Sequence, residues 1–236
     1  MSRIMDYSFL FQNMPGASKT SKTNIIGSFQ LSQLNSSSVQ AQLKAAGINT
    51  NSKQYKAALK QMMSNANGAM YANVQGIKNL MKGYDKNGDW IDPTTGLTGL
   101  LVTEENAASR KRIISIPESS KDEMFELTKK EFLRENGVSN GDRTKRSDVY
   151  TNMYRKVQKD DRLAAGHTLE QYERAYRQAF VDAARKADPK WEIGKPIPSG
   201  ALDGITRESI DSTLVKSGSK LVKRASVSGS SLDLHI

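Results

Sequence analysis

Residues 85–92 read Asp-Lys-Asn-Gly-Asp-Trp-Ile-Asp, a stretch in which oxygen-bearing side chains recur at every second position. Asp85, Asn87 and Asp89 could direct three oxygen ligands at one ion if the backbone wraps around it. Hard cations prefer carboxylate, amide and carbonyl oxygens. The chemistry that this stretch predicts is therefore the binding of a cation and not a reaction.

These residues resemble the loops of calcium hands and dockerin-type modules. The resemblance is partial, because Trp90 and Gly96 stand where a calcium hand has its glycine and its closing glutamate. A loop one residue shorter returns Ile91 and Asp92 to the hand's pattern, and the start of the next helix could supply the closing carboxylate. The resemblance implies a structural calcium ion, with ligands drawn from Asp85, Asn87, Asp89, Ile91, Asp92, Glu104 and Glu105. The alternative is a loop whose Asp and Asn side chains only accept hydrogen bonds from turn backbone.

The residues needed for common kinds of catalysis are missing or badly placed. The chain has no cysteine, which excludes thiol nucleophiles and thiolate metal sites. The two histidines are His167, expected to flank the start of a helix, and His235 near the end of the chain. Neither a Gly-x-Ser-x-Gly elbow nor a glycine-rich phosphate loop occurs. We therefore expect a protein that is not an enzyme, with calcium as its one expected cofactor.

Positive charge is concentrated in the first third of the chain. The net charge is +10, and residues 1–82 contain nine basic residues against a single acid, Asp6. Such a segment could meet nucleic acid, anionic lipid or an acidic protein surface. Because the lysines are spaced singly and lack interleaved aromatic residues, a solvated face is the favoured reading. No apolar stretch is long enough to span a membrane, and the N-terminus lacks the apolar core of a cleaved signal peptide.

Helical periodicity dominates the middle of the chain. Apolar residues recur at the spacing of one buried face over 52–65 and again over 69–82, which predicts two helices that form a hairpin. A short helix is expected over 37–46, before the hairpin. After the acidic loop, residues 97–102 are interrupted by glycine and are expected to form a β-bridge at most, and a helix is expected over 103–112.

Three longer helices are expected further on, over 117–136, 147–163 and 168–187. The polar loop 138–146 would separate two groups of helices. Thr168 heads a Thr-Leu-Glu-Gln sequence, which resembles a capping box and predicts the start of the last long helix.

The pattern as a whole predicts an all-α fold, namely a helical hairpin plus a helical bundle with flexible polar ends. A final short helix is expected over 206–214. The expected divisions are a flexible basic segment at 1–50, a helical domain at 51–215 with sub-bundles 51–137 and 144–215, and a Ser-rich tail at 216–236.

The apolar opening Asp-Tyr-Ser-Phe-Leu-Phe-Gln-Asn-Met at 6–14 and the sequence Ala-Leu-Asp-Gly-Ile-Thr at 201–206 resemble those of uncharacterised proteins of Gram-positive bacteria. This resemblance implies an exported or surface-associated helical protein. We expect a structural or interaction protein with a protein partner. The alternative is a nucleic-acid-associated protein or a phage virion component that uses the basic N-terminal third.

Overall fold

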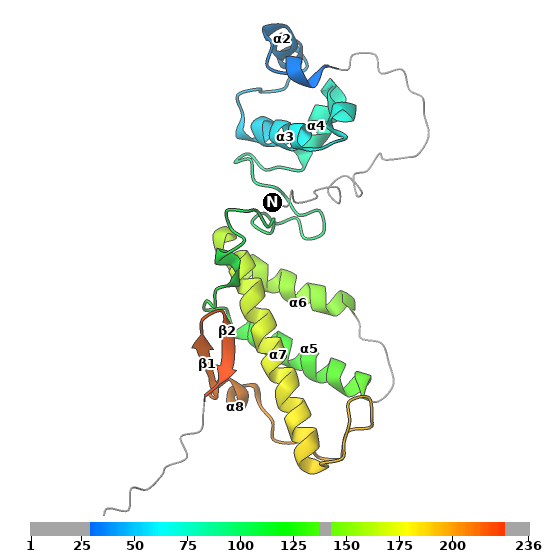
Figure 1. Cartoon of the computed structure of the whole chain (residues 1–236), viewed down its shortest axis with the longest axis vertical. Helices are drawn as coiled ribbons and strands as arrows, with labels where there is room; N and C mark the ends of the chain where they lie inside the picture. Colours follow the sequence, from blue (N-terminus) through cyan, green and yellow to red (C-terminus); the bar gives the residue numbers. More distant parts are fainter. Residues whose placement is uncertain (1–28, 137–142, 225–236) are drawn as a thin grey trace, which may run out of the picture. The chain divides into compact units, whose positions relative to one another are not determined.

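The computed structural model describes residues 29–136 and 143–224 (Figure 1). The apolar opening at 6–14, the tail beyond 224 and His235 lie outside the described residues. Within them the structure is mostly helical with one two-stranded sheet, which confirms the predicted fold class. In chain order, with η for a 3-10 helix, the elements are η1 (Leu31–Gln33), α2 (Ser37–Ala45), α3 (Lys53–Ser64), η2 (Gly68–Tyr71), α4 (Val74–Lys82), η3 (Ser109–Lys111), α5 (Glu118–Glu135), α6 (Arg143–Lys156), η4 (Lys159–Asp161), α7 (Arg162–Ala187), α8 (Arg207–Asp211), β1 (Leu214–Ser217) and β2 (Lys220–Lys223).

The chain divides into two compact units, Met1–Thr98 and Gly99–Ile236, which we call the N-terminal and C-terminal units. The division differs from the sub-bundles 51–137 and 144–215 that periodicity suggested. The difference arises because α5 packs against α6 and α7, so the segment carrying α5 belongs with the later helices.

The N-terminal unit is built on the hairpin of α3 and α4. The helix predicted over 52–65 is confirmed as α3, and Ser52 caps it by accepting a hydrogen bond from the Tyr55 amide at 3.1 Å. Asn73 caps α4 through the Gly76 amide at 2.8 Å, so the single helix predicted over 69–82 is divided into η2 and α4. α3 and α4 pack against each other, so the hairpin is confirmed, with the 3-10 helix η2 in its connection.

The helix α2 completes the core of this unit. Leu34 and Leu43 are 1% and 0% exposed, so the segment expected to be flexible over 1–50 is packed from Leu34 onward. The short helix expected over 37–46 is confirmed as α2. The buried apolar residues of the unit form one cluster: Leu34, Val39, Leu43, Ile48, Tyr55, Ala58, Met62, Ala72, Ile77, Leu80 and Tyr84.

The central element of the C-terminal unit is α7, which is 26 residues long. α5, α6, α8 and β2 all contact it, and Figure 1 shows α5 and α6 crossing the same long helix. Phe125 meets Tyr176 edge to face with ring centroids 5.4 Å apart, and Phe180 lies 5.6 Å from Phe132. Such aromatic pairs add about 0.5–1.5 kcal/mol to the stabilisation from burial alone. Aromatic contacts between α5 and α7 therefore hold the core of this unit.

Thr168 does not cap a helix, because α7 begins six positions earlier, at Arg162. The Thr168 side chain is fully buried; its hydroxyl donates to the Ala164 carbonyl at 2.9 Å and accepts from the Ile114 amide at 3.1 Å. The capping-box sequence does not mark a helix start here. The Thr168 hydroxyl bonds to Ala164 and Ile114 and not to the backbone amides that a cap would use. The predicted helix over 147–163 ends earlier, as α6, and η4 links it to α7.

The helix expected over 103–112 is replaced by turns that end in η3. The Asn106 side chain accepts from the Thr103 amide at 2.8 Å and donates to the Leu101 carbonyl at 3.0 Å. The Asn106 amide also donates to the Thr103 hydroxyl at 3.4 Å, so the two residues bond as in a helix cap, and the Ala107 amide donates to the Thr103 carbonyl at 2.9 Å. A helical turn therefore begins where the sequence predicted, but it does not continue as a helix.

The expected Ser-rich tail at 216–236 contains the end of a β-hairpin. β1 and β2 pair antiparallel, with Ser217 opposite Lys220. Gly218 has a φ of +58°, which a two-residue hairpin turn requires at its first central position. The helix expected over 206–214 ends as α8 at Asp211, three residues before β1 begins.

Candidate functional site

The Asp85 loop, residues 85–92, is closed at its base by backbone contacts. Tyr84 and Trp90 form an isolated antiparallel bridge, whereas residues 97–102, where a β-bridge at most was expected, form none. The Ile91 amide donates to the Gly83 carbonyl at 2.9 Å, which continues the pairing. The two ends of the loop are thereby held together.

The Asp85 carboxylate organises the turn inside the loop. Its Oδ1 accepts hydrogen bonds from the Asn87 amide at 2.8 Å and the Asp89 amide at 2.9 Å. Gly88, with a φ of +82°, occupies the left-handed region that the turn needs. One carboxylate oxygen of the expected cation site therefore accepts hydrogen bonds from turn backbone. This is the arrangement expected for a loop that is only a turn.

The remaining expected ligands are engaged locally or lie elsewhere. Asp92 accepts from the Thr94 amide at 3.2 Å and from the Thr95 hydroxyl at 2.6 Å. Glu104 and Glu105 are exposed in a turn of the C-terminal unit. In residues 29–136 and 143–224, no three His, Cys, Asp or Glu side chains are grouped to hold a metal. Calcium binding at the Asp85 loop stays a prediction.

The first turn of α3 fixes the Asp85 loop in place. The Gln54 side-chain amide donates to the Met81 carbonyl at 2.8 Å and the Tyr84 carbonyl at 2.7 Å. A Cβ atom at Gly88 would lie 2.9 Å from the Lys53 carbonyl oxygen, so only glycine fits against the helix there. Gln54 and Lys53 of α3 therefore hold the loop and its base against the helix.

All the charged residues of α2, α3 and α4 are lysines. Residues 29–82 contain no Asp or Glu and six lysines, all of them exposed. None of the six forms an ion pair with a described residue. We call this set the helix lysines: Lys44, Lys53, Lys56, Lys60, Lys78 and Lys82. Lys53, Lys56 and Lys60 lie at helical spacing along α3, which brings residues that look scattered in the sequence onto one surface.

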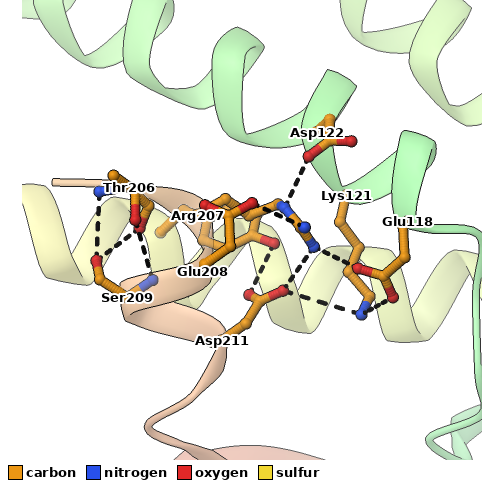
Figure 2. Close-up of polar contacts among 9 residues, drawn as sticks. Glu118, Lys121, Asp122, Thr206, Arg207, Glu208, Ser209 and Asp211 are labelled. Carbon is orange, nitrogen blue, oxygen red and sulfur yellow. Dashed lines mark hydrogen bonds and ion pairs between the residues drawn. The ribbon is translucent and has the colours of Figure 1, made fainter.

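In the C-terminal unit, some cationic side chains are surrounded by carboxylates. The cluster around Arg207 is an example. The Arg207 side chain is only 14% exposed, and Figure 2 shows carboxylates of α5 and α8 gathered around it. Its ion pairs are with Glu118 at 2.5 Å, Asp122 at 2.7 Å, Glu208 at 2.9 Å and Asp211 at 3.1 Å. This arrangement ties the short helix α8 to α5.

Asp211 links the same cluster to α7. The Tyr176 hydroxyl donates to its carboxylate at 3.0 Å. The Lys121 ammonium lies 3.9 Å from the same carboxylate, as Figure 2 shows. Burial raises the pKa of the Asp211 carboxyl, against the opposing effects of the Tyr176 hydrogen bond and the charge of Lys121. The cluster is a structural ion network between three helices.

A second network joins α5, α6 and α7 through Arg146. Its guanidinium lies 2.5 Å from the Glu131 carboxylate and 2.7 Å from that of Glu173, whose side chains are 6% and 13% exposed. Burial raises the pKa of Glu173, and the charge of Arg146 opposes this shift. Both carboxylates are held by a cation that α6 supplies.

His167 lies inside α7, so the prediction that it flanks a helix start is wrong. Its Nε2 atom lies 2.6 Å from the carbonyl oxygen of Ser219, in the turn of the β-hairpin. The side chain therefore joins α7 to the hairpin.

A sequence profile described as a domain of unknown function, DUF3879, matches residues 48–236. The chain belongs to this family. The DUF3879 match takes in every element from α3 to β2, and with them the Asp85 loop and all the helix lysines except Lys44. The expectation of an uncharacterised family is confirmed; origin in Gram-positive bacteria stays a prediction. No curated protein and no solved structure matches the chain. Within the described ranges, no helix is both long and apolar enough to cross a membrane.

Two arrangements of this DUF3879 protein were missed from the sequence. The lysines of α3 follow the i, i+3, i+7 pattern, a signal that was available once the helix itself had been predicted. The Arg207 cluster had no such signal, because Arg207 and Glu118 are separated by 89 residues.

Proposed function

We propose that this DUF3879 protein is a non-enzymatic interaction protein that binds an anionic partner through the helix lysines of its N-terminal unit. The observation that carries the proposal is the charge of segment 29–82, which has six exposed lysines and no acidic residue. None of these lysines has a described acidic partner, and acidic residues occur throughout the C-terminal unit. Unpaired surface charge of one sign attracts and orients a partner of the opposite sign.

The state of the buried acids supports a role without catalysis. Glu131 and Glu173 share Arg146, and Asp211 is held by Arg207 and Lys121. A general acid or base needs access to a substrate as well as a shifted pKa. The hollows on the outer faces of α3 and α5 are open to solvent and are not lined by these acids.

The proposal is tested by measuring the affinity of the full chain for poly-L-glutamate at about 50 and about 300 mM salt. A variant with Lys56, Lys60, Lys78 and Lys82 changed to Gln should lose most of the binding. The control changes four exposed lysines of the C-terminal unit to Gln and has the same net charge: Lys186, Lys190, Lys195 and Lys220. Equal losses in the two variants would mean that only total charge matters, and the proposal would be wrong.

A further inference from the structure

The outer face of α3 combines positive charge with exposed apolar surface. Lys56, Leu59, Lys60, Met63 and Ser64 line one shallow hollow whose surface is mostly apolar. Met63 is 56% exposed, so much of this apolar side chain is open to solvent. The opposite face of the helix is buried in the core of the N-terminal unit. The hollow therefore lies on the exposed face of a helix whose other face is packed in the core.

The two kinds of residue occupy adjacent edges of this face. At 100° per residue, Leu59 and Met63 fall together on one side, and Lys56 and Lys60 fall beside them, within an arc of about 120°. The two lysines are one turn apart, with Cα atoms about 6 Å apart along the axis. The face thus presents an apolar edge next to a cationic edge.

We propose that this face of α3 docks an acidic amphipathic helix from a partner protein. Carboxylates one turn apart on the partner pair with Lys56 and Lys60, and an adjacent leucine-like side chain enters the hollow beside Leu59 and Met63. The inference rests on the proposed function and names the class of partner. Charge complementarity carries it, since no acidic residue of the segment 29–82 is available to neutralise these lysines.

The apolar edge favours a protein helix over nucleic acid. A phosphate backbone would satisfy the lysines but would leave Met63 and Leu59 without an apolar partner. Residues 29–98 contain no arginine, the residue best suited to phosphate and base recognition. Methionine suits a helix-binding surface because its flexible thioether adapts to different side chains.

The experiment uses a labelled peptide of about 18 residues, long enough to be helical, with Glu one turn apart beside a Leu stripe in an Ala-rich background. Its binding to the full chain is followed by fluorescence anisotropy. A second peptide carries Gln at every Glu position, and a DNA duplex and phosphatidylserine vesicles serve as alternative anionic probes.

Three variants separate the contributions of the two edges. Lys56→Gln/Lys60→Gln removes the cationic edge, and Met63→Ser removes the exposed apolar group. Lys186→Gln/Lys190→Gln is the control with the same change of charge, because these two lysines of the C-terminal unit are also exposed and form no ion pair with a described residue. They are not among the helix lysines, so the proposed function gives them no part in binding.

The α3 lysine variant and Met63→Ser should each weaken binding of the Glu peptide about fivefold or more, and Lys186→Gln/Lys190→Gln by less than about twofold. The Gln peptide should bind more weakly to the wild type. Equal losses in the two lysine variants would overturn both proposals, whereas unchanged binding by Met63→Ser would overturn the inference and leave the proposed function standing. Tighter binding of DNA or vesicles than of peptide, insensitive to Met63→Ser, would also overturn it. If none of the anionic probes binds, both proposals fail.

Discussion

Replacing Arg207 by Met should destabilise the C-terminal unit by about 2–3 kcal/mol, a magnitude that follows from the exposure of its partners. Glu118, Asp122 and Glu208 are 65%, 57% and 69% exposed, so each can return to water. Exposed pairs of this kind contribute about 0–1 kcal/mol each. Asp211 is only 17% exposed, and breaking a buried pair costs about 3–5 kcal/mol. Because Asp211 keeps other polar neighbours, the expected loss lies at or below the lower end of that range.

The tryptophans provide the assay. The chain has two, Trp90 in the N-terminal unit and Trp191 in the core of the C-terminal unit. In a Trp90→Phe background, fluorescence during urea unfolding reports the C-terminal unit alone. Far-ultraviolet dichroism then checks whether the N-terminal unit unfolds separately.

A double-mutant cycle identifies the partner that matters. Arg207→Met with Asp211→Asn should give a coupling energy of about 1 kcal/mol or more, and Arg207→Met with Glu208→Gln about 0.5 kcal/mol or less. Equal coupling in the two cycles, or a stable Arg207→Met protein, would refute the view that burial of Asp211 decides the strength of the network.

Three further outcomes are expected. If the Asp85 loop binds calcium, millimolar calcium should raise the melting temperature of the wild type and not that of Asp85→Asn, whose amide oxygen can still accept the two turn hydrogen bonds; an unchanged wild-type melting curve would leave the loop as a turn only. Burial raises the pKa of Glu173, so the folded state binds its proton more readily and this group's contribution to stability falls as pH rises through the raised pKa. The stability of Glu173→Gln relative to wild type in urea unfolding should therefore be more favourable at about pH 7 than at about pH 4, and a constant difference would contradict the shift. Thr168→Val should cost about 1–3 kcal/mol because it leaves the partly buried Ile114 amide without its hydrogen bond, whereas Thr168→Ser keeps the hydroxyl and should cost less; equal losses would assign the effect to packing.

Elements specified by neighbouring residues were predictable from the sequence. The helix expected over 52–65 forms over Lys53–Ser64, because its buried stripe and the Ser52 cap are local features. The β-hairpin was missed although a signal existed: Leu-Val-Lys before the turn is repeated as Leu-Val-Lys after it, around Gly218-Ser219. Its strands are four residues each, too short for alternation to stand out.

Features that depend on distant residues were not predictable. The hydroxyl of Thr168 suits a helix cap, and only the approach of Ile114, 54 positions away, gives it another role. The Asp85 loop shows the same limit for chemistry. Alternating oxygens predict a cation site, but the same atoms can accept hydrogen bonds from backbone amides, as Asp85 does here. Sequence spacing identifies the oxygens, and the fold decides what they contact.

The last elements of the chain pack on the C-terminal unit, and this affects the order in which the two units fold during synthesis. Lys216 in β1 donates to the Ile113 carbonyl at 3.0 Å, across 103 residues, and β2 packs on α7. The core cluster of the N-terminal unit is complete by Tyr84, so this unit can fold while the ribosome is still making the rest. The buried core of the C-terminal unit extends to Ile210 in α8, so this unit must wait for nearly the whole chain. The lysine-bearing unit is thus ready to meet a partner first, and a chain that stops before α8 would keep this unit folded while the second core lacks Ile210.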